Sequence, residues 1–287
     1  GSVVVSDWIC KTSSPMTSTF LILGASLMDA GNVSRASDDL VLGEQIAIAI
    51  GGDPKDVQLF PLPDPPRPQS ARLHNYAHGG AQSGSGPSLE EEAGNVRIGF
   101  KRQVRAVRRH AEFYQSLSDV DVLISAGAND LLDQLEDGSA FAAVLNTEDR
   151  SDDRQLIRSN ATEVARNLRR GVDRLTGLVD EVVVAGAFPV SATPEVQAMA
   201  EELDSATFDR LIEILDGIGA KVQRKLERRF AADESVVVLN LKAAWDRVDD
   251  PLFIDAVHPS SDTSRQWAEL MVPDLMQQLN SFGFSEG

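Results

Sequence analysis

The sequence predicts an α/β sandwich with a central parallel sheet of about five strands. Short apolar runs alternate along the chain with longer helical patterns, and the runs are apolar at successive positions rather than at every second one. Strands of that kind are buried on both faces, which is typical of a parallel sheet covered by helices. No internal repeat and no Ser/Gly linker interrupts the alternation, so a single domain is the simpler interpretation.

The expected strands are the apolar runs at residues 19–24, 57–60, 119–127, 181–186 and 235–241. Residues 96–114 have apolar side chains at helical spacing, so we expect one amphipathic helix there. A last helix is expected to start near Ser261 or Asp262, either of which can cap it. Pro273 should kink or divide this helix, because proline removes a helical hydrogen bond.

Two irregular segments separate these elements. Residues 61–74 contain five prolines, which exclude a helix and favour an extended path on the surface. Residues 133–153 carry seven acids and one arginine. We expect a solvated loop in this second segment, and a mobile lid over a site is the alternative.

The composition limits the possible partners. Lys and Arg total 27 and Asp and Glu total 44, which gives a net charge of −17. Strong negative charge argues against nucleic acid and against anionic membranes as partners. No apolar run approaches about 18 residues, so no membrane span is expected. The sequence leaves the oligomeric state open.

The N-terminal segment and the cysteine content bear on location. Cys10 is the only cysteine and cannot form an internal disulfide, so nothing requires an oxidising compartment. We expect residues 1–16 to be a tag or a disordered segment, and residues 17–283 to form the single domain. The cytoplasm is favoured as the location, and secretion is the alternative if a signal peptide has been removed.

Polar residues and glycines occur where the expected strands end. Ser26 follows the first strand, Gly80 lies in "HNYAHGGAQSG", and Asn129 follows a strand in "GAND". Asp255 and His258 lie in "IDAVHP", after the last apolar run. Because ligands of parallel sheets bind beyond the carboxyl ends of the strands, these residues are the candidates for one site.

Acyl transfer needs this set of groups. A serine hydroxyl becomes a good nucleophile when an imidazole takes its proton, and a carboxylate orients that imidazole. Here Ser26 would attack, His258 would take and return the proton, and Asp255 would orient His258. The Ser26 and Gly80 backbone amides and the Asn129 side chain would donate hydrogen bonds to the oxyanion.

These motifs resemble the GDSL lipase/esterase family within the SGNH hydrolases. "GASLMDAGN" is similar to the first sequence block of that family, "NYAHGGA" to its glycine block, "GAND" to GxND and "DAVHP" to DxxHP. The four motifs occur in the family's order and span most of the chain. The residues of the first two motifs, "DAGN" and "NYAHGGA", are most similar to the branch of plant GDSL lipases and thermolabile haemolysins.

The resemblance implies a flavodoxin-like three-layer sandwich and a serine esterase or lipase. It implies Ser26 as nucleophile, Gly80 and Asn129 as oxyanion donors, and Asp255 with His258 as the acid and base pair. The expected substrate is a small-molecule ester, and an acyltransferase or a sugar deacetylase of the same fold is an alternative. No pair of histidines or cysteines has metal-ligand spacing, so we expect neither a metal nor a cofactor.

One position departs from the family's pattern. Ala25 stands where the family carries the aspartate of its GDS triplet, which is expected to accept backbone hydrogen bonds in the loop. Losing such a carboxylate would cost about 0.5 to 2 kcal/mol if it acts as a cap. We expect activity to be lowered at most, and an impaired or non-catalytic binding protein with the same fold is the alternative from another class.

Overall fold

The computed structural model of the chain describes residues 19–32, 38–50, 53, 55–62, 64–85, 98–136, 141, 145, 147, 149–186 and 189–281. The expected tag or disordered segment at residues 1–16 therefore lies outside the described residues.

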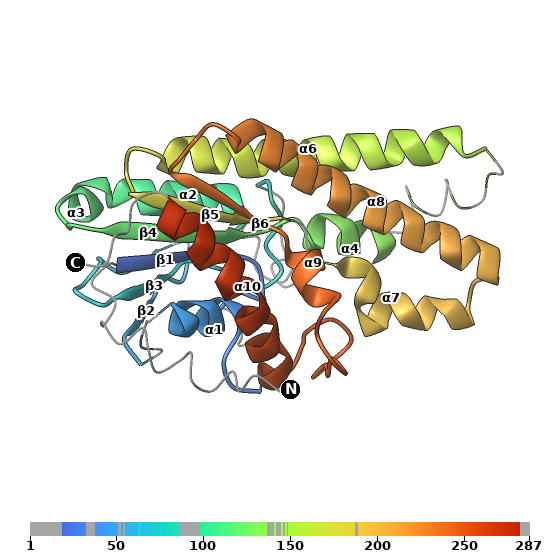
Figure 1. The fold of residues 1–287 in the computed structure, drawn as a ribbon, viewed down its shortest axis with the longest axis horizontal. Helices are drawn as coiled ribbons and strands as arrows, with labels where there is room; N and C mark the ends of the chain where they lie inside the picture. Colours follow the sequence, from blue (N-terminus) through green and yellow to red (C-terminus); the bar gives the residue numbers. More distant parts are fainter. Residues whose placement is uncertain are drawn as a thin grey trace.

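A six-stranded sheet forms the centre of the molecule (Figure 1). Across the sheet, the strands follow the order β2 (Val57–Leu59), β3 (Leu73–Asn75), β1 (Thr19–Gly24), β4 (Val120–Ser125), β5 (Glu181–Ala185) and β6 (Val236–Leu239). All neighbouring strands are parallel. The predicted α/β sandwich with a parallel sheet is thus confirmed.

The sheet has one strand more than the predicted five or so. The additional strand is β3, whose three residues Leu73, His74 and Asn75 are all buried. A strand with two polar residues gives no apolar run, so the sequence pattern could not reveal it. Its polar side chains are buried because they form hydrogen bonds to other segments of the chain.

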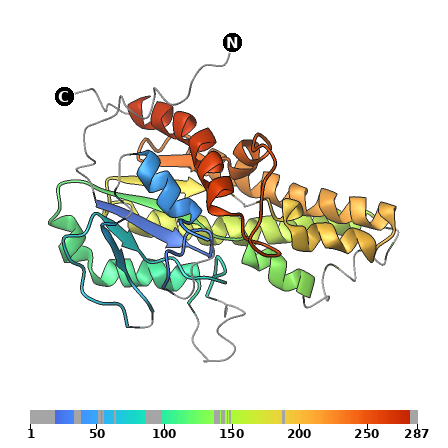
Figure 2. The same ribbon diagram turned by 90° about the horizontal axis from the view of Figure 1, so that it is seen from below.

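Helices cover both faces of the sheet (Figures 1 and 2). On one face lie α2 (Phe100–Arg109), α6 (Ser151–Leu175) and α8 (Ser205–Phe230), which contact β1, β5 and β6 respectively. On the other lie α1 (Leu42–Ala49) and α10 (Ser261–Ser281), which pack against each other. The shorter helices are α3 (Ala111–Gln115), α4 (Asn129–Glu136), α7 (Pro194–Ala198) and α9 (Leu241–Trp245), with the 3₁₀ turns η3 (Val190–Ala192) and η4 (Met199–Glu201).

Three expectations about helices need correction. The expected helix at residues 96–114 is divided at His110 into α2 and α3, and residues 96 and 97 lie outside the described part. The last helix continues through Pro273, so the expected division there is wrong, and a kink at Pro273 stays a prediction. Its N-cap is Ser260, whose hydroxyl accepts a hydrogen bond from the Thr263 amide at 3.2 Å. Neither Ser261 nor Asp262 fills this position.

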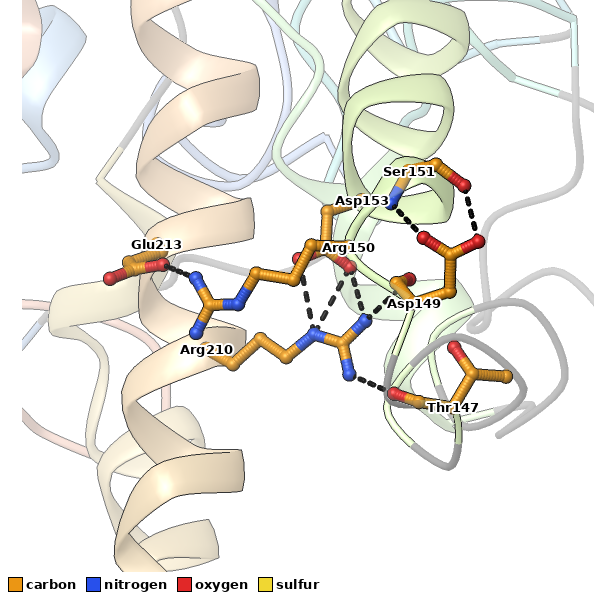
Figure 3. Close-up of polar contacts among 7 residues, drawn as sticks. All are labelled: Thr147, Asp149, Arg150, Ser151, Asp153, Arg210 and Glu213. Carbon is orange, nitrogen blue, oxygen red and sulfur yellow. Dashed lines mark hydrogen bonds and ion pairs between the residues drawn. The ribbon is translucent and has the colours of Figure 1, made fainter.

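Figure 3 shows how the start of α6 is fastened to α8. The guanidinium of Arg210 on α8 pairs with the carboxylate of Asp153 on α6 at 2.6 Å, and both side chains are buried. Arg210 also donates hydrogen bonds to the carbonyl oxygens of Thr147 and Asp149. The expectation that residues 133–153 form a solvated loop is therefore wrong at its end, where Asp153 is buried in an ion pair. Its beginning belongs to α4.

No helix within the described residues has an apolar stretch long enough to cross a bilayer.

Candidate active site

Ser26 lies in a tight turn directly after β1. Gly24, the last residue of β1, approaches β4 so closely that a Cβ atom at this position would lie 1.9 Å from the Ser125 carbonyl oxygen. The Ala25 amide then donates to the same oxygen at 3.1 Å. A turn closes behind the serine, because the Met28 amide donates to the Ala25 carbonyl at 2.9 Å. The sheet therefore presents Ser26 at the carboxyl ends of its two central strands.

Ser26, His258 and Asp255 form one hydrogen-bonded series. The Ser26 Oγ lies 2.8 Å from His258 Nε2, and His258 Nδ1 lies 2.7 Å from Asp255 Oδ2. Because a carboxylate only accepts hydrogen bonds, His258 Nδ1 carries a proton and donates a hydrogen bond to Asp255. Nε2 of a neutral imidazole is then the acceptor that faces the serine hydroxyl.

Asp255 also shapes the turn that carries His258. Its Oδ1 accepts hydrogen bonds from the Val257 and His258 amides at 2.8 Å and 2.6 Å. Ile254 donates to the His258 carbonyl at 2.8 Å and closes the loop. Burial of the carboxylate opposes ionisation, but the hydrogen bonds from the His258 ring and from the two amides hold the pKa of Asp255 below its usual range. Asp255 is therefore ionised at neutral pH and able to orient His258.

Gly80 and Asn129 lie on two adjoining segments. Gly80 has a φ of 71°, a left-handed conformation that favours glycine. The Asn129 side-chain amide donates to the Ala81 carbonyl at 3.1 Å, which leaves its second N–H available. Among the described residues, none accepts a hydrogen bond from the backbone amide of Ser26 or of Gly80. These N–H groups are thus available to a ligand.

A small cleft opens beside the serine. Its volume is about 20 Å³, enough for about one water molecule. Ser26, Asn129 and His258 supply the polar part of its lining. The remaining lining is mainly apolar, from Ala25, Leu27, Ser125, Ala126, Ala128, Leu132 and Val257. The described cleft thus combines a hydroxyl, an imidazole and an amide with a narrow apolar floor.

Sequence reasoning missed the residues that hold the turn of Ser26 against the glycine segment, residues 74–84. The carboxylate of Asp29 is fully buried and accepts hydrogen bonds from the Gly31 amide at 2.8 Å and from the Gly79 amide at 2.9 Å. Asn32 donates to the Ala77 carbonyl at 2.8 Å. Both residues stand in the quoted "GASLMDAGN" block, so their polar side chains in a glycine-containing turn were the available signal.

Asp130 holds the other end of the glycine segment. Its carboxylate accepts hydrogen bonds from the Ser83 amide and the Ser83 hydroxyl, both at 2.7 Å. Burial raises the pKa of Asp130 to about 6, although the hydrogen bonds from Ser83 favour the ionised form. Since Asn129 contacts Ala81 and Asp130 contacts Ser83, the first turn of α4 fixes the chain on both sides of Gln82.

His78, two residues before Gly80, is a structural residue. Its Nε2 accepts a hydrogen bond from the Leu62 amide at 3.0 Å, so Nδ1 carries the proton and donates to the Tyr76 carbonyl at 2.8 Å. Burial lowers the pKa of His78, which keeps the ring neutral.

Comparison with known proteins identifies the family of the chain. The sequence profile of the family described as GDSL-like Lipase/Acylhydrolase matches residues 20–271. The chain belongs to this family. A GDSL-like acylhydrolase is a hydrolase that acts on esters, so the chain is a member of an ester-hydrolase family. The finer assignment to the plant and haemolysin branch stays a prediction.

Solved structures similar to this GDSL-like chain include two carbohydrate esterases. An acetylxylan esterase from Geobacillus stearothermophilus is 14% identical, with a TM-score of 0.48 over 94% of this chain and 96% of that one. A family 3 carbohydrate esterase from Clostridium thermocellum is 13% identical, with a TM-score of 0.45 over 92% of this chain and 99% of that one. No curated protein sequence matches the chain.

Proposed function

We propose that the protein hydrolyses carboxylic esters through an acyl-enzyme on Ser26. The observation that carries this proposal is the continuous series from the Ser26 hydroxyl through the His258 ring to the Asp255 carboxylate, with distances of 2.8 Å and 2.7 Å. Side chains 232 residues apart in the sequence meet here in the order that nucleophilic catalysis requires. A hydrogen bond with a purely structural role does not need a hydroxyl, an imidazole and a carboxylate in this order beside an open cleft.

In the first half-reaction, the Ser26 Oγ attacks the ester carbonyl carbon and its proton passes to His258 Nε2. The carbonyl oxygen becomes an oxyanion, which the free amides of Ser26 and Gly80 and the second N–H of Asn129 stabilise. His258 then gives the proton to the leaving alkoxide, and the acyl group stays on Ser26. In the second half-reaction, water gives its proton to His258 and attacks the acyl carbon. Ser26 leaves with the returned proton and the carboxylic acid is released.

The size of the cleft supports a short acyl group. A cleft volume of about 20 Å³ with an apolar floor accommodates about an acetyl methyl group rather than a long chain. A panel of p-nitrophenyl esters of rising acyl length tests this, and kcat/KM is expected to be highest for the shortest members. A maximum at long chains would contradict the proposed acyl specificity but not ester hydrolysis.

Three alanine variants test the mechanism. Removing Ser26 or His258 is expected to lower kcat by about 10⁶, because residues that act as a unit fail together. Removing the Asn129 amide is expected to lower kcat by about 10² to 10³. A folded Ser26→Ala variant that keeps most of the activity would contradict an acyl-enzyme on this residue.

An impaired or non-catalytic binding protein is the rival hypothesis, because Ala25 replaces the carboxylate of the family's pattern. It predicts binding of the ester in the cleft without turnover.

Acyltransfer to an added alcohol, or release of acetate from an acetylated sugar, would refine the substrate class without changing the roles proposed for Ser26 and His258.

A further inference from the structure

One buried amide next to the candidate site has no part in the proposed mechanism. Gln103 lies on α2 and is fully buried. Its Oε1 accepts a hydrogen bond from the Gly24 amide at 2.8 Å, and its Nε2 donates to the Gly24 carbonyl at 2.8 Å. The side chain thus forms hydrogen bonds with both backbone polar groups of Gly24, two positions before Ser26.

Gly24 is the point at which three segments meet. Its carbonyl also accepts a hydrogen bond from the His78 amide at 3.0 Å, in the glycine segment. On the other side, the next residue along, Ala25, donates to the Ser125 carbonyl of β4. Because a Cβ atom on Gly24 would clash with that carbonyl, this backbone has little room to move on the β4 side. The amide of Gln103 holds it from the side of α2.

The first turn of α2 also holds the glycine segment. The first N–H groups of a helix have no partners within the helix. Here the Phe100 amide donates to the Gln82 carbonyl at 2.9 Å, and the Lys101 amide donates to the Gly84 carbonyl at 3.2 Å. The first turn of α2 therefore contacts the segment after Gly80 and, through Gln103, the end of β1. It fixes the distance between the two.

We propose that Gln103 is a positioning residue, which sets the Ser26 turn in register with the oxyanion donors Gly80 and Asn129. This inference rests on the proposed function, since it concerns the geometry of the same reaction. Gln103 touches neither the substrate nor the reacting atoms, so its effect on the reaction passes through Gly24. Without its two hydrogen bonds to Gly24, the end of β1 would keep its close contact with β4 and the hydrogen bond from the His78 amide, but nothing from α2 would hold Gly24.

A purely structural role predicts a different result from a positioning role. Loss of a structural hydrogen bond lowers stability but leaves the turnover of the folded protein unchanged. A misplaced nucleophile lowers kcat while KM changes little, because a displacement of about 1 Å in the reacting geometry can cost about 100-fold in rate.

The test compares Gln103→Met, Gln103→Glu and the control Gln223→Met. Methionine preserves the shape of the side chain but forms neither hydrogen bond. A buried glutamic acid in its neutral form accepts from the Gly24 amide and donates to its carbonyl, and burial raises the pKa of such a group. Gln223 on α8 is likewise buried, and its amide bonds to Glu227, which is not part of the candidate site.

For folded proteins, we expect kcat on p-nitrophenyl acetate to fall about 10- to 100-fold in Gln103→Met, with little change in KM. Gln223→Met should leave kcat unchanged. In Gln103→Glu the decrease in kcat should be smaller than in Gln103→Met. The ratio of its kcat to that of the wild type should fall as pH rises and the glutamic acid ionises.

A kcat of Gln103→Met within about twofold of the wild type would overturn the inference. If Gln103→Met does not fold, Gln103→Glu decides, and a kcat ratio that equals one at every pH would overturn it. A wild type without esterase activity refutes the proposed function and this inference together, whereas an active wild type with an unaffected Gln103→Met refutes this inference alone.

Discussion

At the scale of single residues, the candidate site depends on side chains that bind backbone rather than substrate. Asp29, Asn32 and Gln103 are joined to distant amides and carbonyls, and Asp255 shapes the turn of His258. Ala25 stands among them without a polar side chain. It is buried and lines the cleft, so a change there acts directly on the serine turn.

Ala25→Asp tests whether a carboxylate at this position is useful to this chain. If the added carboxylate accepts backbone hydrogen bonds, the free energy of unfolding should rise by about 0.5 to 2 kcal/mol. Turnover should rise with it, because the Ser26 turn becomes more rigid. Thermal unfolding and p-nitrophenyl acetate kinetics measure both quantities. An unchanged melting point together with an unchanged rate would show that the position is unimportant.

His74 makes stability depend on pH. Burial lowers its pKa to about 4, against 6.5 in the unfolded chain. The unfolded state therefore binds a proton at a higher pH than the folded state, so stability is lost as pH falls from 6.5 toward 4. The full loss amounts to about 3 kcal/mol. Above pH 6.5 both states are neutral at this residue, and it gives no pH dependence.

Urea denaturation of the wild type and of His74→Gln between pH 7 and pH 4 measures this effect. The glutamine at position 74 cannot titrate, so the free energy of unfolding of this variant should fall less steeply with pH. The curves of unfolding free energy against pH for the two proteins should therefore converge as pH falls. Parallel curves would mean that His74 is not the group responsible.

At the scale of elements, the buried ion pair of Asp153 with Arg210 joins the start of α6 to α8. Removing one partner of such a pair leaves an uncompensated buried charge, which costs about 3 to 5 kcal/mol. Asp153→Leu alone and Arg210→Met alone should therefore each be strongly destabilising. The double variant Asp153→Leu with Arg210→Met leaves no charge unpaired. Its free energy of unfolding should therefore fall by much less than the sum of the decreases in the two single variants. Equal additive losses in urea denaturation would contradict a direct interaction.

The matched control is the exposed pair between Arg150 and Glu213. It also joins the start of α6 to α8 (Figure 3). Surface pairs contribute only about 0 to 1 kcal/mol to the free energy of unfolding. Glu213→Ala should accordingly change the unfolding free energy very little.

The sequence also showed its limits at this scale. Continuous apolar runs predicted the long central strands, because burial on both faces leaves a simple pattern. The pattern could not reveal β3, whose buried His74 and Asn75 are satisfied by partners far away in the chain. Nor could it show that Asp153 is buried, since an acid in an acidic segment has the appearance of a solvated residue until Arg210 is placed beside it.

At the scale of the whole molecule, the sheet brings together segments that are far apart in the chain. The motifs named the five candidate residues because acyl transfer needs particular chemical groups and the carboxyl ends of parallel strands lie at one edge. The supporting hydrogen bonds of Asp29 and Gln103 were not predictable, because a single side chain gives no sign of which distant backbone it will meet.

Removal of metal ions tests the proposed chemistry on the intact protein. Among the described residues, no group of three or more His, Cys, Asp or Glu side chains is arranged to hold a metal ion. A mechanism that uses only Ser26, His258 and Asp255 should proceed at full rate in excess chelator. Loss of activity that returns with an added divalent cation would contradict it.

The most direct test of the central claim is labelling with a fluorophosphonate, followed by mass spectrometry of the peptide that contains Ser26. An activated serine attacks the phosphorus and expels fluoride, so one adduct on Ser26 is expected in the folded protein. Heated protein should show no adduct, and His258→Ala should react far more slowly. Folded protein that stays unlabelled, or that carries its adduct on another serine, would contradict the claim that His258 activates Ser26.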